Sequence, residues 1–382
     1  MTTTAARITP AMKCTVSPSA LGAALGLVSR AVSPRSTLPI LGNVLLETTE
    51  DGLRLSATNL DLTISATVAA EVENEGRTTV PARLITDYIA SLAEAPCELE
   101  LDPTTHILRV SCGVHRSHIH GIDAVEFPPL PAADGDTSVE VDAAELEAAI
   151  AQTALAASTD EARPVLTGVK LDIDGSKLTL AATDGHRLAV RTLELDRGLD
   201  EPVSVIVPAR HLQEVARAVN AGRPRVSITL SRQRNQLFFT LRDLEISSRL
   251  IEGTYPNYGQ VIPAESTTTV TVPAATLLRE TRTASVLAKD AANVVRLAAR
   301  EGTLTLTTQT AEVGEDEAPL RADVEGDDVQ IAFNAKYVLD ALGVVDAEKV
   351  KLGFNGPLSP GIIRPVDRDD YLYIVMPVRV PM

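Results

Sequence analysis

One motif, a strand that runs into a helix, occurs three times in this chain at almost equal intervals. The clearest copy spans residues 205–215, and related copies begin at residues 79 and 331. Counting from Pro81, Pro208 and Asn334, the separations are 127 and 126 residues. Recurrence in step is typical of tandem repeats. Because about 125 residues is an ordinary domain size, we predict three similar domains: 1–137, in which 1–11 form a flexible extension, 138–264 and 265–382.

The three copies share a charge pattern as well as an apolar one. In the middle copy, apolar residues from Leu212 to Val219 follow the spacing of one buried helical face. Each copy also has a base two residues, and an acid six residues, after its anchor: Arg83 and Asp87, Arg210 and Glu214, Lys336 and Asp340. These charges form either ion pairs on a solvated helix face or a set of cations directed at one shared anion.

Each third of the chain reads as strand, helix and hairpin, followed by the repeated strand and helix. Glycine stands at or near the expected hairpin turns, at Gly52, Gly175 and Gly302. Two helices with several alternating strands bury their apolar faces by packing helix on sheet. We therefore predict an α+β fold in which each of three similar domains packs two helices on antiparallel sheets.

Composition limits the classes of function. A hydrophobic content of 45% is ample for globular cores, and the formal charge of −16 argues against a general binder of nucleic acid or anionic membranes. Any contact with nucleic acid must therefore be local. Cys14, Cys97 and Cys112 form no C-x-x-C pair, which favours reduced thiols. With no signal peptide and no apolar run of membrane-spanning length, we expect a soluble cytoplasmic protein.

A row of similar domains leaves an unpaired sheet edge at either end. Joining the first domain of one chain to the third of another would close a dimeric ring. Twelve helices spaced by about 10 Å would surround a hole of about 28 Å once a helix width of about 10 Å is subtracted, which suits a nucleic-acid duplex.

The charge distribution agrees with a lined hole. The expected helix windows, 17–35, 82–93, 142–158, 209–225, 273–289 and 334–346, together carry +3, which leaves −19 for the remainder. A mildly positive lining inside an acidic shell attracts phosphates without reading bases.

Three other classes of protein fit parts of the sequence. An enzyme could use Asp184 and His186 with a nearby serine, but no G-x-S-x-G, P-loop or dinucleotide-binding motif occurs. A repeated adhesion or scaffolding protein would explain the periodicity but not the charge split. A zinc site could involve four histidines and a nearby cysteine, but no acid in the H-x-H strand would orient the rings. We predict no catalytic residue, no cofactor and no metal. The zinc candidates are His106, His115, His118, His120 and Cys112.

Five segments in order carry a resemblance to a known family: 37–43, 79–83, 182–189, 255–258 and 376–379. Over 12–379 the chain resembles the bacterial sliding clamps, the beta subunits of DNA polymerase III. The resemblance implies a ring-shaped homodimer that encircles duplex DNA regardless of sequence and has no catalytic activity. It also implies that the DNA polymerase III alpha subunit, the clamp loader, other polymerases and repair proteins bind through short peptides.

The resemblance further implies a peptide pocket between the second and third domains. Its residues would be Leu166, Thr183, Gly185, His186, Arg187, Leu188, Pro256, Val261, Asn334, Tyr337, Ile374, Val375, Met376, Pro377, Val378 and Arg379. The chain departs from some members at Pro164 and Val165, where an aromatic pair can stand, and at Gln260 on the pocket rim. Pro381 and Met382 extend past the usual end and could partly cover the pocket.

Contacts with DNA and with the second chain are implied in the same way. Arg35, Arg83 and Arg210 match positions that face the hole or its rim, whereas Arg279, Arg282 and Lys336 follow from the repeat and the window charges alone. Arg116 and Ile119 would lie at the dimer edge and face Val286 and Leu287 of the other chain. Protonation of the nearby histidines near pH 6 would add charge there and weaken the dimer.

Overall fold

The computed structural model describes residues 12–33, 38–219, 224–288, 293–310 and 314–379. The chain divides into two compact units. Unit 1 comprises 1–143 and 217–250, and unit 2 comprises 144–216 and 251–382. Arg35, the extension 1–11 and the last two residues lie outside the described residues.

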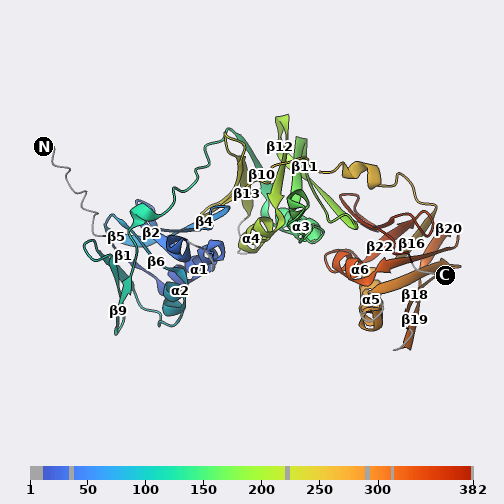
Figure 1. Ribbon diagram of the computed structural model, residues 1–382, viewed down its shortest axis with the longest axis horizontal. Coiled ribbons are helices and arrows are strands. Elements are labelled where there is room, and N and C mark those ends of the chain that lie inside the picture. Colours follow the sequence, from blue (N-terminus) through green and yellow to red (C-terminus); the bar gives the residue numbers. More distant parts are fainter. Residues whose placement is uncertain (1–11, 34–37, 220–223, 289–292, 311–313, 380–382) are drawn as a thin grey trace. The chain divides into compact units, whose positions relative to one another are not determined.

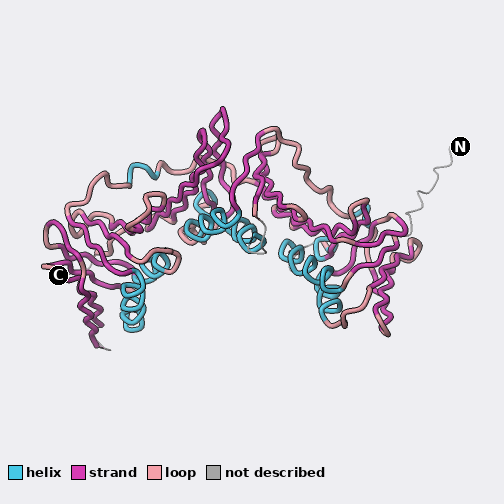
Figure 2. Tube along the Cα trace, turned by 180° about the vertical axis from the view of Figure 1, so that it is seen from behind, coloured by secondary structure: helices cyan, strands magenta, loops and turns pink. Residues whose placement is uncertain are grey.

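Six α-helices occur among the described residues, two in each third of the sequence (Figure 1). They are α1 (Pro18–Val28), α2 (Ala82–Ala90), α3 (Ala143–Ala154), α4 (Ala209–Val219), α5 (Ala274–Ala288) and α6 (Ala335–Leu342). Local signals set their starts, because Ser17 caps α1 ahead of a proline at its first position, and Asn334 caps α6. Figure 2 shows α1 and α2 together in unit 1, and α5 and α6 together in unit 2.

The sheets of unit 1 are antiparallel. One has the order β5-β1-β7-β8-β9 and ends on β9 (His115–His120), and the other has the order β10-β13-β14-β15-β4-β3-β2-β6. Their remaining strands are β1 (Lys13–Val16), β2 (Asn43–Thr49), β3 (Gly52–Thr58), β4 (Leu62–Val68), β5 (Ala70–Asn74), β6 (Arg77–Pro81), β7 (Cys97–Asp102), β8 (Ile107–Cys112), β10 (Thr137–Asp142), β13 (Arg225–Leu230), β14 (Gln236–Leu241) and β15 (Leu244–Arg249).

The sheets of unit 2 are also antiparallel. Their orders are β11-β12-β24-β23-β22-β16-β20 and β19-β18-β17-β21. The strands are β11 (Gly168–Thr183), β12 (Arg187–Pro208), β16 (Thr268–Pro273), β17 (Val294–Arg300), β18 (Thr303–Thr310), β19 (Gly314–Arg321), β20 (Asp323–Gly326), β21 (Val329–Asn334), β22 (Lys349–Phe354), β23 (Gly361–Pro365) and β24 (Tyr371–Val375).

The repeat read from the sequence reappears in the strand register. The three anchors end the strands β6, β12 and β21, and a helix follows each of them at once. Each anchor also pairs with the first residue of an equivalent strand: Asn43 with Pro81, Gly168 with Pro208, and Val294 with Asn334. The strand-to-helix prediction is therefore confirmed in all three thirds.

Two of the predicted hairpins are confirmed directly. β2 pairs with β3 up to Thr49 and Gly52, and β17 pairs with β18 up to Arg300 and Thr303. In the middle third the predicted hairpin at Gly175 is wrong: Gly168–Thr183 form the single strand β11, and Gly175 lies where its register with β12 shifts. Gly52 and Gly302 both have positive φ, which a glycine adopts without strain.

The sheets continue across the expected domain junctions. β15 of the middle third pairs with β4 of the first, Ile246 opposite Ile64. β12 pairs with β24 of the last third, Leu188 opposite Ile374. The middle third is consequently shared between the two compact units, and boundaries at 137/138 and 264/265 stay a prediction.

Candidate functional site

The turn between β11 and β12 is fixed by its own side chains. The Asp184 carboxylate accepts from the backbone amides of His186 at 2.8 Å and Arg187 at 3.1 Å. The Thr183 hydroxyl donates to the Arg187 carbonyl at 2.6 Å and accepts from the Gly185 amide at 3.1 Å. Gly185 has φ of 93°, which explains glycine at this position. Four hydrogen bonds within the turn thus hold its backbone in this conformation.

The Tyr255 side chain holds the start of this turn. Its phenol oxygen accepts from the Thr183 amide at 3.1 Å, and its ring is buried. Burial raises the pKa of Tyr255 to about 12, so the phenol stays neutral at physiological pH. The segment 255–258, near the end of the middle third, is therefore tied to the turn.

The C-terminal segment runs along the other side of the turn. β24 pairs with β12, and the Met376 amide then donates to the His186 carbonyl at 2.8 Å. Farther on, the Val378 amide donates to the Ala332 carbonyl at 2.8 Å. Backbone hydrogen bonds therefore hold this segment between the turn and β21.

Arg187 is the centre of the site. Only 8% of its side chain is exposed, and Nε lies 3.0 Å from the Asp184 carboxylate. Nη1 lies 2.6 Å from Asp340 on α6 and 3.4 Å from the Tyr373 hydroxyl. The guanidinium also lies over the Tyr337 ring, 4.6 Å from its centroid, an arrangement that is attractive for a cation.

Two cations and two carboxylates meet at Arg187, so their formal charges cancel. Lys336 Nζ lies 2.7 Å from the Asp340 carboxylate, so Arg187 and Lys336 face Asp184 and Asp340. Burial by itself would lower the pKa of the Arg187 guanidinium, but Tyr373, Asp340 and Asp184 outweigh burial and raise it above its ordinary value. Arg187 is permanently charged, and its charge is already paired.

Hydrogen bonds and a cation–π contact join several residues predicted for the pocket. Thr183, Gly185, His186, Arg187, Asn334, Tyr337, Met376 and Val378 lie in or beside the network of the turn, α6 and the C-terminal segment. Leu188, Ile374 and Val375 are buried in the ladder between β12 and β24 and can form only the floor of a pocket.

Apolar surface lies on the segments that carry this network. Met376 is 38% exposed and Val261 is 45% exposed. Pro256, Gly185, His186 and Arg379 are also exposed, and Leu166 and Pro377 are half-buried. Exposed apolar side chains on a rigid frame are suited to bind apolar groups of a partner.

Apart from Arg35, which lies outside the described residues, the bases predicted to face DNA lie on helices and are exposed. The Arg83 side chain is 96% exposed and lies 3.8 Å from Asp87. Arg210 and Arg282 are exposed. The Arg279 guanidinium lies 2.8 Å from Glu280, and Lys336 is tied to Asp340.

The residues predicted for the dimer edge differ in exposure. Val286 is 65% exposed, whereas Ile119 is 4% exposed because it faces the core from β9. Leu287 is half-buried, and exposed Arg116 donates to the carbonyls of Gly113 and His115. β9 and β19 are the outermost strands of their sheets.

Among the described residues, no group of three histidine, cysteine or acidic side chains is placed to hold a metal ion. In the same part of the chain, no helix has the length and apolar character needed to cross a membrane.

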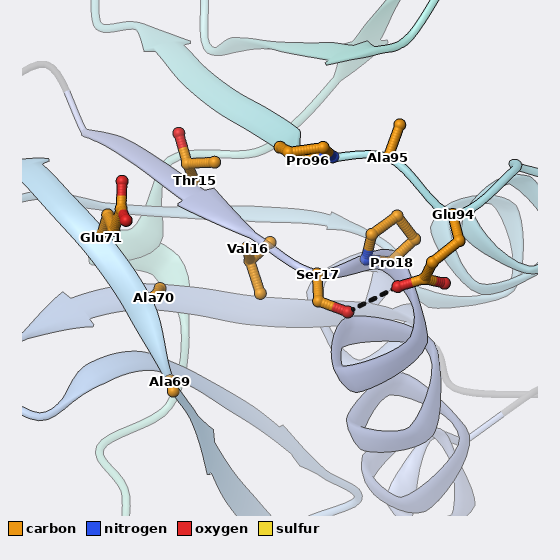
Figure 3. Close-up of a pocket in the computed structure, with 10 residues that line it drawn as sticks. All are labelled: Thr15, Val16, Ser17, Pro18, Ala69, Ala70, Glu71, Glu94, Ala95 and Pro96. Atoms are coloured by element: carbon orange, nitrogen blue, oxygen red, sulfur yellow. Dashed lines mark hydrogen bonds between the residues drawn. The ribbon is translucent and has the colours of Figure 1, made fainter.

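A separate hollow of about 580 Å³ lies in unit 1 between β1, β5 and the start of α1 (Figure 3). At its rim the Ser17 hydroxyl donates a hydrogen bond to the Glu94 carboxylate at 2.9 Å. Ser19 also donates to Glu94 at 3.2 Å, so local hydroxyls already engage the carboxylate. Sequence reasoning did not anticipate this hollow.

Sequence reasoning also missed the roles of Asp340 and Tyr373. The spacing of Lys336 and Asp340 predicted only an ion pair on the helix surface, and that pair exists. No sequence signal placed Asp340 against Arg187, because the two lie on elements far apart in the chain.

Three family profiles match the chain. Residues 12–131 match the N-terminal domain, 140–257 the central domain and 259–379 the C-terminal domain of the DNA polymerase III beta subunit. The beta sliding clamp of Synechocystis is 36% identical over 97% of this chain and 100% of its own length. That of Bacillus subtilis is 30% identical over 96% of this chain and 100% of its own length.

Solved structures agree with the profiles. The crystal structure of the Bacillus subtilis DNA polymerase sliding clamp has a TM-score of 0.92 at 29% identity and covers 97% of this chain and 100% of that one. The Thermotoga maritima DNA polymerase III beta subunit has a TM-score of 0.89 at 29% identity, with the same coverage.

Proposed function

The chain belongs to the family of DNA polymerase III beta subunits, the bacterial sliding clamps, and from this premise we propose how it holds DNA and its partners. Members of this family are processivity factors without catalytic activity of their own. The chain accordingly acts as a DNA sliding clamp that tethers polymerase. The main support is that each anchor residue pairs with the first residue of an equivalent strand in all three thirds. The chain also matches these clamps over nearly its full length.

We propose that two copies close a ring head to tail around duplex DNA in the cytoplasm. The unpaired edge of β9 in one copy would join that of β19 in the other, which removes two open sheet edges. Val286 and Leu287 would cover this junction. Light scattering at micromolar concentration should give twice 40.5 kDa, and Val286→Glu should give a monomer. A wild-type monomer would contradict the ring.

We propose that the bases on the helices contact phosphates without base specificity. These bases are Arg83, Arg210, Arg279, Arg282 and Lys336. Because each phosphate contact releases counterions, Arg83→Ala and Arg210→Ala should each weaken binding to DNA of any sequence and reduce the salt slope by about one. Arg300→Ala is the matched control, since its side chain is 64% exposed but lies on β17. An equal loss in the control would contradict a role specific to the helices.

We propose that short peptides from the DNA polymerase III alpha subunit, the clamp loader, other polymerases and repair proteins bind beside the turn 183–187 and the C-terminal segment. Met376→Ala should weaken binding of an alpha-subunit peptide about tenfold or more, because an apolar contact that becomes buried on binding is lost. Leu358→Ala is the matched control, since Leu358 is also exposed, at 66%. Isothermal titration would compare them, and equal affinities would contradict this site.

A further inference from the structure

The carboxylate of Asp340 lies between two cations. Arg187 Nη1 and Lys336 Nζ both approach its Oδ2 atom, at 2.6 and 2.7 Å. Among the described residues, the donors that reach this carboxylate are these two side chains. The Asp340 carboxylate is therefore held by charge-assisted hydrogen bonds from two side chains, and its removal need not disturb a backbone hydrogen bond.

Asp184, the second acid at Arg187, has a different task. Its Oδ1 atom accepts the amides of His186 and Arg187, so it builds the turn as well as pairing with the guanidinium. Changing Asp184 would disrupt the frame of the site. Asp340 is thus the position where charge can be altered separately from the frame.

The position of the Asp340 carboxylate can be reached from solvent. Its side chain is 27% exposed, whereas that of Arg187 is 8% exposed. A carboxylate from a partner could therefore occupy the place of Asp340 against Nη1, if Asp340 did not already hold it. As the chain stands, a partner's acid would have to displace an internal ion pair, which cancels most of its gain.

We propose that Asp340 is the specificity-determining positioning residue of the peptide site: it holds Arg187 paired, so that the site selects partner peptides by apolar groups and gives no advantage to acidic ones. The inference rests on the proposed function, because it assumes that partner peptides bind beside Arg187. The Arg187 guanidinium, stacked on the Tyr337 ring and paired with acids of its own chain, then does not bind a carboxylate of the peptide.

The test uses full-length protein and synthetic heptapeptides with two apolar residues, made in matched pairs with serine or aspartate at one other position. Wild type should bind the two members of a pair within about twofold. Asp340→Asn should favour the aspartate member by about tenfold, because a charge-assisted hydrogen bond to Arg187 becomes available. Fluorescence anisotropy at low and high salt measures both, and high salt should reduce the preference.

Asp340→Asn also removes the ion-pair partner of Lys336. A second variant therefore distinguishes the contribution of Lys336 from that of Arg187. Lys336→Gln with Asp340→Asn should keep the preference for aspartate, whereas Lys336→Gln alone should resemble wild type. Asp340→Glu should restore the behaviour of wild type, since it retains the charge. Loss of the preference in the double variant would assign it to Lys336 and overturn the proposal.

The remaining outcomes are also decisive. An unchanged ratio in Asp340→Asn, with near-ultraviolet circular dichroism like that of wild type, overturns the role of Asp340 but leaves the peptide site standing. Failure of wild type to bind any pair overturns the peptide site, and the inference with it. A preference for aspartate in wild type would show that Arg187 is already available.

Discussion

The guanidinium of Arg191 lies 2.5 Å from the carboxylate of Asp370, and only 2% of the Arg191 side chain is exposed. Its other terminal nitrogen lies 2.8 Å from Glu145 on α3. Burial by itself would raise the pKa of Asp370, but Arg368 and Arg191 outweigh burial and hold it below its ordinary value. Arg191 and Arg187 stand at opposite ends of the ladder between β12 and β24, so an ion pair fastens each end.

The Arg191 pair should respond unequally to loss of either partner. Asp370→Asn leaves a buried guanidinium with Glu145 alone and should lower the free energy of unfolding by about 2 to 3 kcal/mol. Arg191→Met returns two partly exposed acids to water and should cost about 1 kcal/mol or less. Urea unfolding followed by circular dichroism would measure both changes.

The matched control for this pair is Asp328→Asn. Asp328 lies 3.8 Å from Arg300, and both side chains are mostly exposed, so the change should stay within about 0.5 kcal/mol. A larger loss for Arg191→Met than for Asp370→Asn would contradict the account of the buried charge.

Gly361 should not tolerate a methyl group. A Cβ atom there would collide with the Phe333 ring, so Gly361→Ala should destabilise the protein by about 1 to 3 kcal/mol through overpacking. Gly26→Ala is the control, because a Cβ atom on that residue of α1 meets nothing within 4 Å. Helix propensity predicts that the control gains about 0.5 to 1 kcal/mol. Thermal unfolding should therefore shift in opposite directions, and shifts of the same sign would refute this.

The phenol of Tyr255 should matter to the turn that it anchors. Tyr255→Phe removes the acceptor of the Thr183 amide and should cost about 1 to 2 kcal/mol, because a half-buried donor loses its partner. Peptide binding should weaken with it, since the turn carries Arg187. Tyr88→Phe, on α2, serves as the control and should change stability by less than about 0.5 kcal/mol. Equal effects would argue against the anchoring role.

Cys97 should make stability fall at alkaline pH. Burial raises its pKa from 9.0 to about 12, so the folded state keeps a proton that the unfolded state releases. The contribution is fully present below pH 9 and is lost between pH 9 and 12 by up to about 1.4 kcal/mol per pH unit. Between pH 8 and 10.5, wild type should therefore lose about 2 kcal/mol more than Cys97→Ala in urea unfolding. Identical losses would contradict the shift.

Local patterns in the sequence predicted much of this fold. The in-step anchors Pro81, Pro208 and Asn334 predicted where three strands become helices, because helix periodicity and turn chemistry act over a few residues. The same patterns predicted hairpins at Gly52 and Gly302. The i, i+4 spacing likewise predicted the pair of Lys336 and Asp340.

The resemblance named residues that the structure gathers around one turn. It included Arg187 and Tyr337, which are in contact. It could not say that Ile119 faces inward from its strand, because exposure of one face of an edge strand depends on what packs against the sheet.

The sequence by itself therefore determined the repeat, the points at which three strands become helices, and the ion pairs of Arg83 with Asp87 and of Lys336 with Asp340. Only the tertiary structure decided that Asp340 meets Arg187, that Arg191 is buried between Glu145 and Asp370, and that sheets continue across the junctions of the repeats. The physical reason is the separation of the interacting residues along the chain. A side chain chooses a partner far along the chain only after sheet register has brought the two together, and no periodicity of neighbouring residues encodes that meeting.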